Sequence, residues 1–271
     1  MITNALVMAE IGAGSLLLAM FLMWLISVRI KNAGIVDVGW ALGLVLLAVW
    51  YAWRGSGFPA RRWILAAMVA LWGLRLAVHL VRRILREPED GRYQQLRRDW
   101  NGRNVNLRFL FFFEAQALLD ILLSLPMLLA AINPEPKLSV LEYLGIALWL
   151  VAVTGETIAD AQLTAFKRNP ANRGHVCQYG LWNYSRHPNY FFEWFVWVAW
   201  AVYALASPSG WLVLICPVLM LFFLYRVTGI PATEAQALRS RGQEYARYQQ
   251  STSAFVPWFK KASAAQEMRF L

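Results

Sequence analysis

Long apolar runs are the feature that most limits what this chain can fold into. Charged residues make up only 15% of its 271 residues, and they cluster between apolar runs of about 18 residues or more. A helix of roughly 20 residues crosses the hydrocarbon core of a bilayer. Backbone groups inside lipid must pair within their own segment, and these runs are too long and too uniformly apolar for barrel strands. The sequence therefore predicts an all-α integral membrane protein.

Seven apolar segments are predicted to be transmembrane helices, packed into one bundle domain that covers residues 1–271 without a linker. The first has no basic segment before it, and its positive charges, Arg29 and Lys31, follow it; we interpret it as a retained span rather than a secretory signal. The expected helices lie at about 5–30, 35–53, 63–85, 107–132, 139–166, 190–206 and 211–228, with a tail at 229–271.

The distribution of positive charge predicts the topology. The segments after helices one, three and five, together with the C-terminal tail, hold 21 of the 26 Lys and Arg, and the segments on the other side hold 4. The positive-inside rule places the first set in the cytoplasm, so the N-terminus is expected outside. The same rule explains the net charge of +10 without a nucleic acid partner. We expect a multi-pass, monomeric protein of a bacterial inner membrane.

Ionisable and polar groups inside the spans need a reason to be there, because each charge costs several kcal/mol. Asp37 lies about one turn inside helix two, where it either offsets the helix dipole or acts as a catalytic acid. His79 on helix three is either a structural hydrogen-bonding group or a catalytic one. Gln116 on helix four either bonds a neighbouring helix or lines a polar cavity. The sequence leaves these alternatives open.

Helix five ends with charged residues on one face. Glu156, Asp160 and Lys167 are separated by four and seven residues, a spacing that aligns them along the helix. Two carboxylates a turn apart repel unless donors satisfy them. Those donors are either the hydroxyl and N–H groups of a ribose or an amide, or arginines of the protein's own loops.

The most specific motif opens helix six, with the sequence GLWNYSRHPNYFFE at 180–193. Pro188 suits the first turn of a helix, where its missing N–H costs nothing. The free N–H groups of that turn, with Arg186 and His187 beside them, are suited to phosphate. A second signature follows in chain order and comprises Arg226, Thr228 to Pro231, Glu234, Tyr245, Tyr248 and the FVPW string at 255–258.

In this order after a hydrophobic bundle, these motifs resemble the steroid 5α-reductase superfamily, in particular its bacterial branch. The resemblance covers most of the chain and is densest over 155–193 and 224–258. It implies a seven-helix bundle that opens to the cytoplasm, binds NADPH among its later helices and reduces a carbon–carbon double bond conjugated to a ketone. The implied substrate is a hydrophobic enone that enters from the lipid, either a Δ4-3-oxosteroid reduced to its 5α form or another enone lipid.

The resemblance also implies roles for individual residues. The catalytic acid of helix two matches Asp37, and the catalytic tyrosine of helix three is matched best by His79, because Tyr93 lies too far along the chain. A protonated Asp37, hydrogen-bonded with His79, would then stabilise the oxyanion that forms on the carbonyl. Trp40 and Gln116 match positions near the substrate. The implied cofactor contacts are Glu156, Asp160, Lys167, Arg173, Tyr184, Arg186, His187, Asn189, Glu193, Arg226, Glu234, and Arg92 or Arg103.

Two other functions remain possible interpretations of the sequence, a methyltransferase and a protein without catalysis. The Arg-His-Pro-x-Tyr string also occurs in membrane methyltransferases that act on isoprenylcysteine or phospholipid headgroups, where it helps to bind S-adenosylmethionine. The Glu156/Asp160 pair, the early Asp37 and the C-terminal FVPW region favour the reductase. A lipid-binding or assembly protein without catalysis would bind neither nucleotide. No Gly-x-Gly-x-x-Gly after a strand is present, so a Rossmann domain is not expected, and neither is a metal site.

Overall fold

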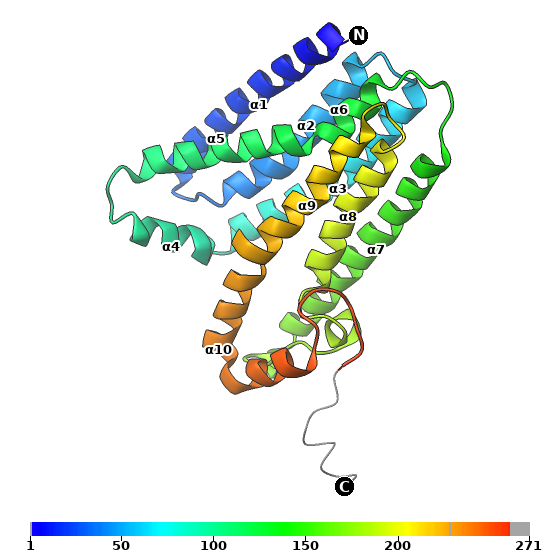
Figure 1. The fold of residues 1–271 in the computed structure, drawn as a ribbon. Coiled ribbons are helices and arrows are strands. Elements are labelled where there is room, and N and C mark those ends of the chain that lie inside the picture. Colours follow the sequence, from blue (N-terminus) through cyan, green and yellow to red (C-terminus); the bar gives the residue numbers. More distant parts are fainter. Residues whose placement is uncertain (1, 228, 261–271) are drawn as a thin grey trace. The chain divides into compact units, whose positions relative to one another are not determined.

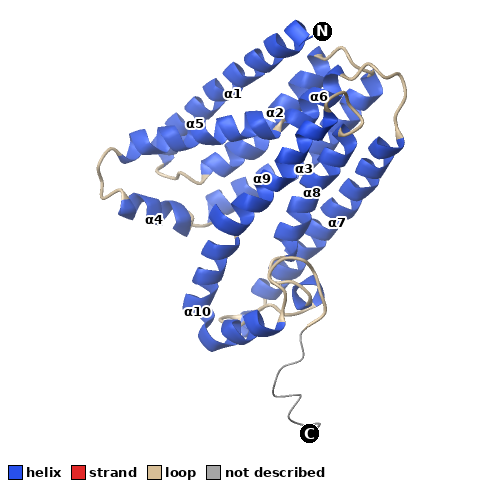
Figure 2. Cartoon of the chain, in the orientation of Figure 1, coloured by secondary structure: helices blue, strands red, loops and turns tan. Residues whose placement is uncertain are grey.

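The computed structural model describes residues 2–227 and 229–260, and across these residues it contains helices and no strand (Figures 1 and 2). The all-α class is confirmed. The helices are α1 (Ile2–Ile30), α2 (Ile35–Arg54), α3 (Pro59–Arg86), α4 (Gly91–Asp99), α5 (Val105–Leu123), α6 (Leu125–Ile132), α7 (Val140–Arg168), α8 (Pro188–Ala204), α9 (Ile215–Phe222) and α10 (Ile230–Ser251).

Among the described residues, six helical segments are long and apolar enough to cross a membrane, which makes this a multi-pass membrane protein. The predicted span at 190–206 corresponds to α8, which has 17 residues and is not among the six. Position 228 and the tail residues 261–271 lie outside the described residues. The six segments are Ala5–Ile30, Ile35–Arg54, Pro59–Arg86, Val105–Ile132, Val140–Arg168 and Gly210–Ser251.

Three helical features differ from the predicted boundaries. The helix expected at 107–132 is divided into α5 and α6 beside Pro126, which has no N–H to donate within the helix. The segment expected as a tail contains α10, and the segment after α3 contains α4. Both of these helices are polar, so a search for apolar runs does not find them. The side chain of Asp90 caps α4 by accepting the N–H of Arg92 at 2.9 Å.

The chain forms two compact units, Met1–Tyr143 with Ala201–Val213, and Leu144–Trp200 with Leu214–Leu271. In the first unit, α2 contacts α1, α3, α5 and α6. Two glycines allow this close packing: a Cβ on Gly73 would lie 2.6 Å from Cγ2 of Val45, and a Cβ on Gly43 would lie 2.6 Å from a carboxyl oxygen of Asp120. These glycines explain how α2 occupies the centre of the first unit.

A buried ion pair joins three parts of the first unit. Arg61 on α3 is 1% exposed and Glu142 at the start of α7 is 0% exposed, and the guanidinium donates to the carboxylate. The guanidinium also donates to the carbonyls of Asn133 at 3.1 Å, Glu135 at 2.7 Å and Lys137 at 2.7 Å. The carbonyl of Arg61 accepts the hydroxyl of Tyr203 at 3.0 Å. The charge is thus paired, and the connection between α6 and α7 is fixed to α3.

In the second unit, α7 and α8 approach each other at a glycine. A Cβ on Gly155 would lie 2.4 Å from the ring of Phe192, so a larger residue does not fit there. The indole N–H of Trp182 donates to the carbonyl of Ala159 at 2.9 Å, and that of Trp194 donates to the carbonyl of Pro217 at 2.9 Å. Beyond α9 the chain continues as a π-helical turn, Phe223–Val227. These contacts hold the loop before α8 and the start of α9 in place.

Candidate functional site

The first candidate cluster, in the first unit, is centred on the carboxylate of Asp37 in the first turn of α2. The hydroxyl of Tyr93 on α4 lies 2.6 Å from Oδ1. The guanidinium of Arg92 lies 3.1 Å from Oδ2, and that of Arg83 on α3 lies 3.6 Å from the same oxygen. Side chains from α2, α3 and α4 therefore meet at one carboxylate.

Local hydrogen bonds explain why α4 folds back onto the start of α2. Glu89, just before α4, accepts the backbone N–H of Ala33 at 2.7 Å and the guanidinium of Arg97 at 2.9 Å. The side chain of Asn32 accepts the N–H of Gly34 at 2.9 Å. The turn before α2 and the turn before α4 are thereby joined, and Tyr93 is carried to Asp37.

The environment of Tyr93 keeps its hydroxyl protonated, so that it can donate a hydrogen bond. Its side chain is only 3% exposed, and its ring packs edge-on against Phe109 and Phe112. Burial raises the pKa of Tyr93 well above its usual value, and the negative charge of Asp37 raises it further. At neutral pH the phenol is protonated and Asp37 accepts its hydrogen bond.

The hydrogen bonds of Asp37 differ from those expected from the sequence. Among the described residues, the partners of Asp37 are Tyr93, Arg92 and Arg83, whereas His79 is exposed on α3 and makes no hydrogen bond to it. The distance along the chain argues against Tyr93 as the partner of Asp37, but the chain reverses direction between α3 and α4 and places Tyr93 next to this carboxylate. Asp37 accepts the hydrogen bond of Tyr93 here, and the catalytic roles expected of Asp37 and His79 stay predictions.

The other predicted residues of the first unit are Trp40, Gln116, Arg103 and Arg92. Trp40 packs edge-on against Trp72 of α3 with ring centroids 5.9 Å apart, and Gln116 is half-buried on α5. Arg103 is exposed between α4 and α5. Arg92 is occupied by Asp37 and by Asp90, whose carboxylate lies 3.1 Å from its Nε. A role of Arg92 toward a cofactor stays a prediction.

The second candidate cluster, in the second unit, is formed by the Arg-His-Pro motif and α10. Arg186 Nε lies 2.7 Å from Oε1 of Glu234, and His187 Nε2 lies 3.3 Å from the same oxygen. The amide of Gln249 donates to the other carboxylate oxygen at 2.9 Å. The ring of His187 stacks on that of Tyr190, which fixes its plane. The structure therefore brings Arg186, His187 and Glu234 together, as the resemblance implied for a shared site.

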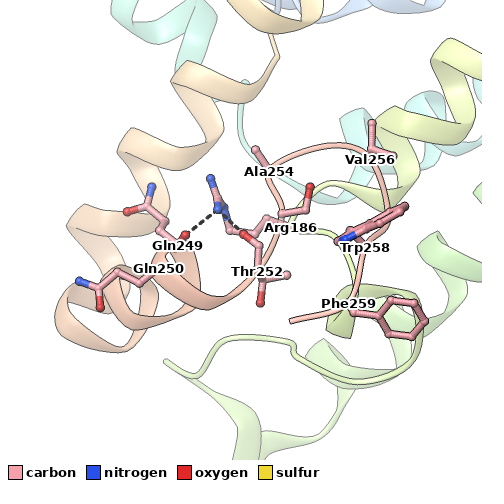
Figure 3. A pocket seen from close by; sticks show the side chains of 9 residues that line it. Arg186, Gln249, Gln250, Thr252, Ala254, Val256, Trp258 and Phe259 are labelled. Atoms are coloured by element: carbon pink, nitrogen blue, oxygen red, sulfur yellow. Dashed lines mark hydrogen bonds between the residues drawn. The ribbon is translucent and has the colours of Figure 1, made fainter. Parts of the chain in front are cut away.

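Arg186 also ties the C-terminal segment to the start of α8. Its Nη1 donates to the carbonyls of Gln249 at 3.0 Å and Thr252 at 2.6 Å (Figure 3). Its backbone N–H donates to the carbonyl of Ser253 at 2.8 Å. A pocket of about 430 Å³ opens beside the guanidinium, and Trp258 and Phe259 are among its lining residues (Figure 3). Tyr245 of α10 also hydrogen-bonds to the side chain of Arg186.

Substituting Arg186 by lysine is expected to loosen the C-terminal segment. A lysine ammonium cannot make the forked set of bonds from Nε and Nη1, although it keeps the charge. Because hydrogen bonds from charged groups contribute roughly 1.5–3 kcal/mol each, amide hydrogen exchange over residues 249–258 should accelerate about tenfold or more. Arg247→Lys, at an exposed position of α10, is the matched control. Equal exchange in both variants would show that Arg186 does not hold this segment.

The remaining predicted cofactor residues lie along α7, α8 and the adjoining loops. Glu156 is buried, Asp160 is half-buried one turn later, and Asn189 and Glu193 are half-buried a turn apart on α8. The carbonyl of Tyr184 accepts the N–H of Trp258 at 2.9 Å. The exposed members of the set are Lys167, Arg173, Tyr184 and Arg226.

Sequence reasoning missed two residues of the second cluster, Gln249 and Thr252. Gln249 satisfies the carboxylate of Glu234, and Thr252 supplies a carbonyl to Arg186. The nearby tyrosines and the FVPW string had marked this region as part of the motif, but nothing in their spacing indicated what they contact. Tyr248 in fact donates its hydroxyl to the carbonyls of Trp182 and Ser185.

Comparisons with known proteins give one match. The model of a family described as "Protein of unknown function (DUF1295)" matches residues 23–252. The comparisons with curated proteins and with solved structures found no match. The matched range includes both candidate clusters.

Proposed function

Because the chain belongs to the DUF1295 family, we propose that it is an NADPH-dependent membrane reductase of the carbon–carbon double bond of a hydrophobic enone. DUF1295 is a family of membrane proteins related to the steroid 5α-reductases, which supports this reaction class. In this proposal α8 is the seventh span, the N-terminus lies outside and the C-terminus lies in the cytoplasm. The excess of Lys and Arg on one side of the helices supports that orientation.

The observation that carries the proposal is the 2.6 Å contact between the hydroxyl of Tyr93 and the carboxylate of Asp37. Reduction of an enone adds a hydride to the β-carbon, and negative charge then develops on the carbonyl oxygen. When the substrate binds, the hydroxyl of Tyr93 turns from Asp37 to that oxygen and transfers its proton to it, and the resulting enol tautomerises to the ketone with a proton on the α-carbon. Arg92, whose guanidinium lies 5.3 Å from the centroid of the Tyr93 ring, lowers the cost of the phenolate left behind.

Asp37 acts in this scheme as a positioning group that also returns the proton. Its side chain is 25% exposed, whereas Tyr93 is buried, so Asp37 links the phenol to water. A donor held in a largely water-free place stabilises a developing oxyanion far more than one in bulk water. In this proposal the chain differs from the family pattern in the position of the tyrosine along the chain and in the role of the acid, which accepts the hydrogen bond of Tyr93.

The second unit offers groups whose chemistry fits parts of a dinucleotide. Arg186 lines the pocket and its charge is suited to a phosphate, and the rings of Trp258 and Phe259 are suited to a flat base. Glu156 and Asp160 are suited to ribose hydroxyls. When bound, NADPH would supply the hydride.

The test is a nucleotide-binding experiment on the purified full-length protein. Any nucleotide that copurifies is identified by mass spectrometry after denaturation, and the emptied protein is titrated with NADPH and S-adenosylmethionine in parallel. NADPH is expected to bind, and Asp160→Ala and Asn189→Ala are each expected to weaken that binding about tenfold. Asp99→Ala, an exposed carboxylate on α4, serves as the control and should leave the affinity unchanged.

Two results would overturn the assignment. If S-adenosylmethionine binds instead, Arg186, His187 and Glu234 belong to a methyl-donor site and the hydride scheme is discarded. If neither nucleotide binds, the protein belongs to the non-catalytic class of lipid-binding or assembly proteins. Where NADPH binds, a Δ4-3-oxosteroid is the first substrate to supply.

A further inference from the structure

A second, smaller cavity lies in the first unit and takes no part in the proposed reduction. It measures about 180 Å³ and is lined by Ser27, Val28, Lys31, Arg97, Asn106 and Phe109. These residues come from the end of α1, from α4 and from the first turns of α5. Pockets that enclose a whole drug-sized ligand measure about 300–1,000 Å³, so this one suits a single small group.

The cavity walls carry two positive charges. The guanidinium of Arg97 is held in place because Nε and Nη2 donate to Glu89, at 2.9 and 3.0 Å, and because it lies 4.7 Å from the centroid of the Phe109 ring. Among the described residues, its Nη1 has no partner. Lys31 directly follows α1 and its side chain is exposed. One cation is therefore fixed in orientation and the other is free to reach a ligand.

The third wall is the first turn of α5, where Asn106 lines the cavity. Asn106 lies in the first turn of α5, and Asn104, the residue that precedes this helix, makes no side-chain cap bond. The first N–H groups of a helix have no partner within it and favour an anion beside them. The indole N–H of Trp24 donates to the carbonyl of Asn106 at 2.8 Å, which fixes this turn against α1. Two basic side chains and the first turn of α5 thus share one small cavity.

We propose that this cavity binds the phosphate group of an anionic ligand, carried either by a membrane lipid or by a soluble phosphate ester. Basic pockets between membrane helices are suited to anionic headgroups. The two helices that supply most of the wall, α1 and α5, pack side by side and expose apolar side chains that an acyl chain can cover (Figure 1). These side chains include Leu18, Leu22, Leu25, Phe111 and Leu118.

The experiment measures ligand retention by native mass spectrometry on the delipidated full-length protein, with phosphatidylglycerol and glycerol 3-phosphate as probes. Lys31→Asn removes the charge and suits this position, because Lys31 has a φ of 54° and asparagine tolerates that left-handed conformation. It is expected to weaken binding about fivefold or more. Lys31→Arg should restore binding, and Lys137→Asn, an equal charge change in the loop between α6 and α7, should not weaken it.

The two probes separate the possible sources of the phosphate. If phosphatidylglycerol binds in a manner that depends on Lys31 and glycerol 3-phosphate does not displace it, the ligand is a lipid. If glycerol 3-phosphate binds alone with the same dependence, the site takes a soluble phosphate ester. If Lys31→Asn and Lys137→Asn bind both probes equally well, the cavity is not a phosphate site.

Discussion

Replacing Tyr93 with phenylalanine is expected to lower the rate of enone reduction by about 100-fold to 10,000-fold, the usual contribution of a positioned proton donor. The substitution removes the hydroxyl that lies 2.6 Å from Asp37 and keeps the ring that packs against Phe109 and Phe112. The fold and the affinity for NADPH should therefore be unchanged. Turnover is followed by the loss of NADPH absorbance with a Δ4-3-oxosteroid, and affinity by titration.

Two control variants make this result specific to the hydroxyl of Tyr93. Tyr143→Phe changes the same chemical group at a position that is 61% exposed and should leave turnover unaltered. His79→Asn tests the alternative donor on α3 and should also leave turnover unaltered. A large loss of activity in His79→Asn with normal activity in Tyr93→Phe would return the donor role to the histidine.

Breaking the buried ion pair between Arg61 and Glu142 is expected to destabilise the protein by about 3–5 kcal/mol, because the partner that remains is a buried charge without compensation. Arg61→Ala also leaves the carbonyls of Glu135 and Lys137 without their donor. Thermal unfolding of the detergent-solubilised protein should show a clear fall in Tm. Arg29→Ala, at the exposed end of α1, is the control for loss of a positive charge.

Glu142→Gln separates the charge of the pair from its hydrogen bonds. The amide oxygen still accepts the N–H of Ser139, but the guanidinium of Arg61 loses its counter-ion. A fall in Tm comparable to that of Arg61→Ala would assign the stabilisation to charge. A Tm equal to that of the wild type for both variants would contradict the role described for this ion pair.

The membrane-spanning part of the fold was accessible from the sequence, because apolar runs depend on composition alone. The first three spans and the fifth end within a few residues of their predicted limits. The apolar pattern could not reveal α4 or α10, which are stabilised by polar contacts such as the Asp90 cap and the Glu234 cluster. It also could not place Pro126 at a division between two helices, since proline is tolerated inside many membrane spans.

The candidate sites were predictable only in part, because spacing along one helix gives no information about where the chain reverses. The Arg-His-Pro motif and Glu234 were recognised as members of one site, and they do lie together. Its distance along the chain from helix three argues against Tyr93 as the partner of Asp37. In the structure, Glu89 accepts the N–H of Ala33, and this bond joins the turn before α4 to the turn before α2, so that Tyr93 reaches Asp37. In the sequence, Arg61 contributes only to the count of positive charges that predicts the topology. Its role in an ion pair could not be predicted, because its partner Glu142 lies 81 residues away.

The π-helical turn Phe223–Val227 holds one more residue than an α-helical turn would. A deletion of one residue there would restore ordinary helix and leave the side chains on either side close to their present alignment, because the π-helical turn absorbs the extra residue. Family members can therefore differ in length by one residue at this place and still keep both flanking helices. When DUF1295 sequences are aligned, gaps of one residue should therefore concentrate at this turn. The segment before the turn and the segment that contains Glu234 should then be aligned separately.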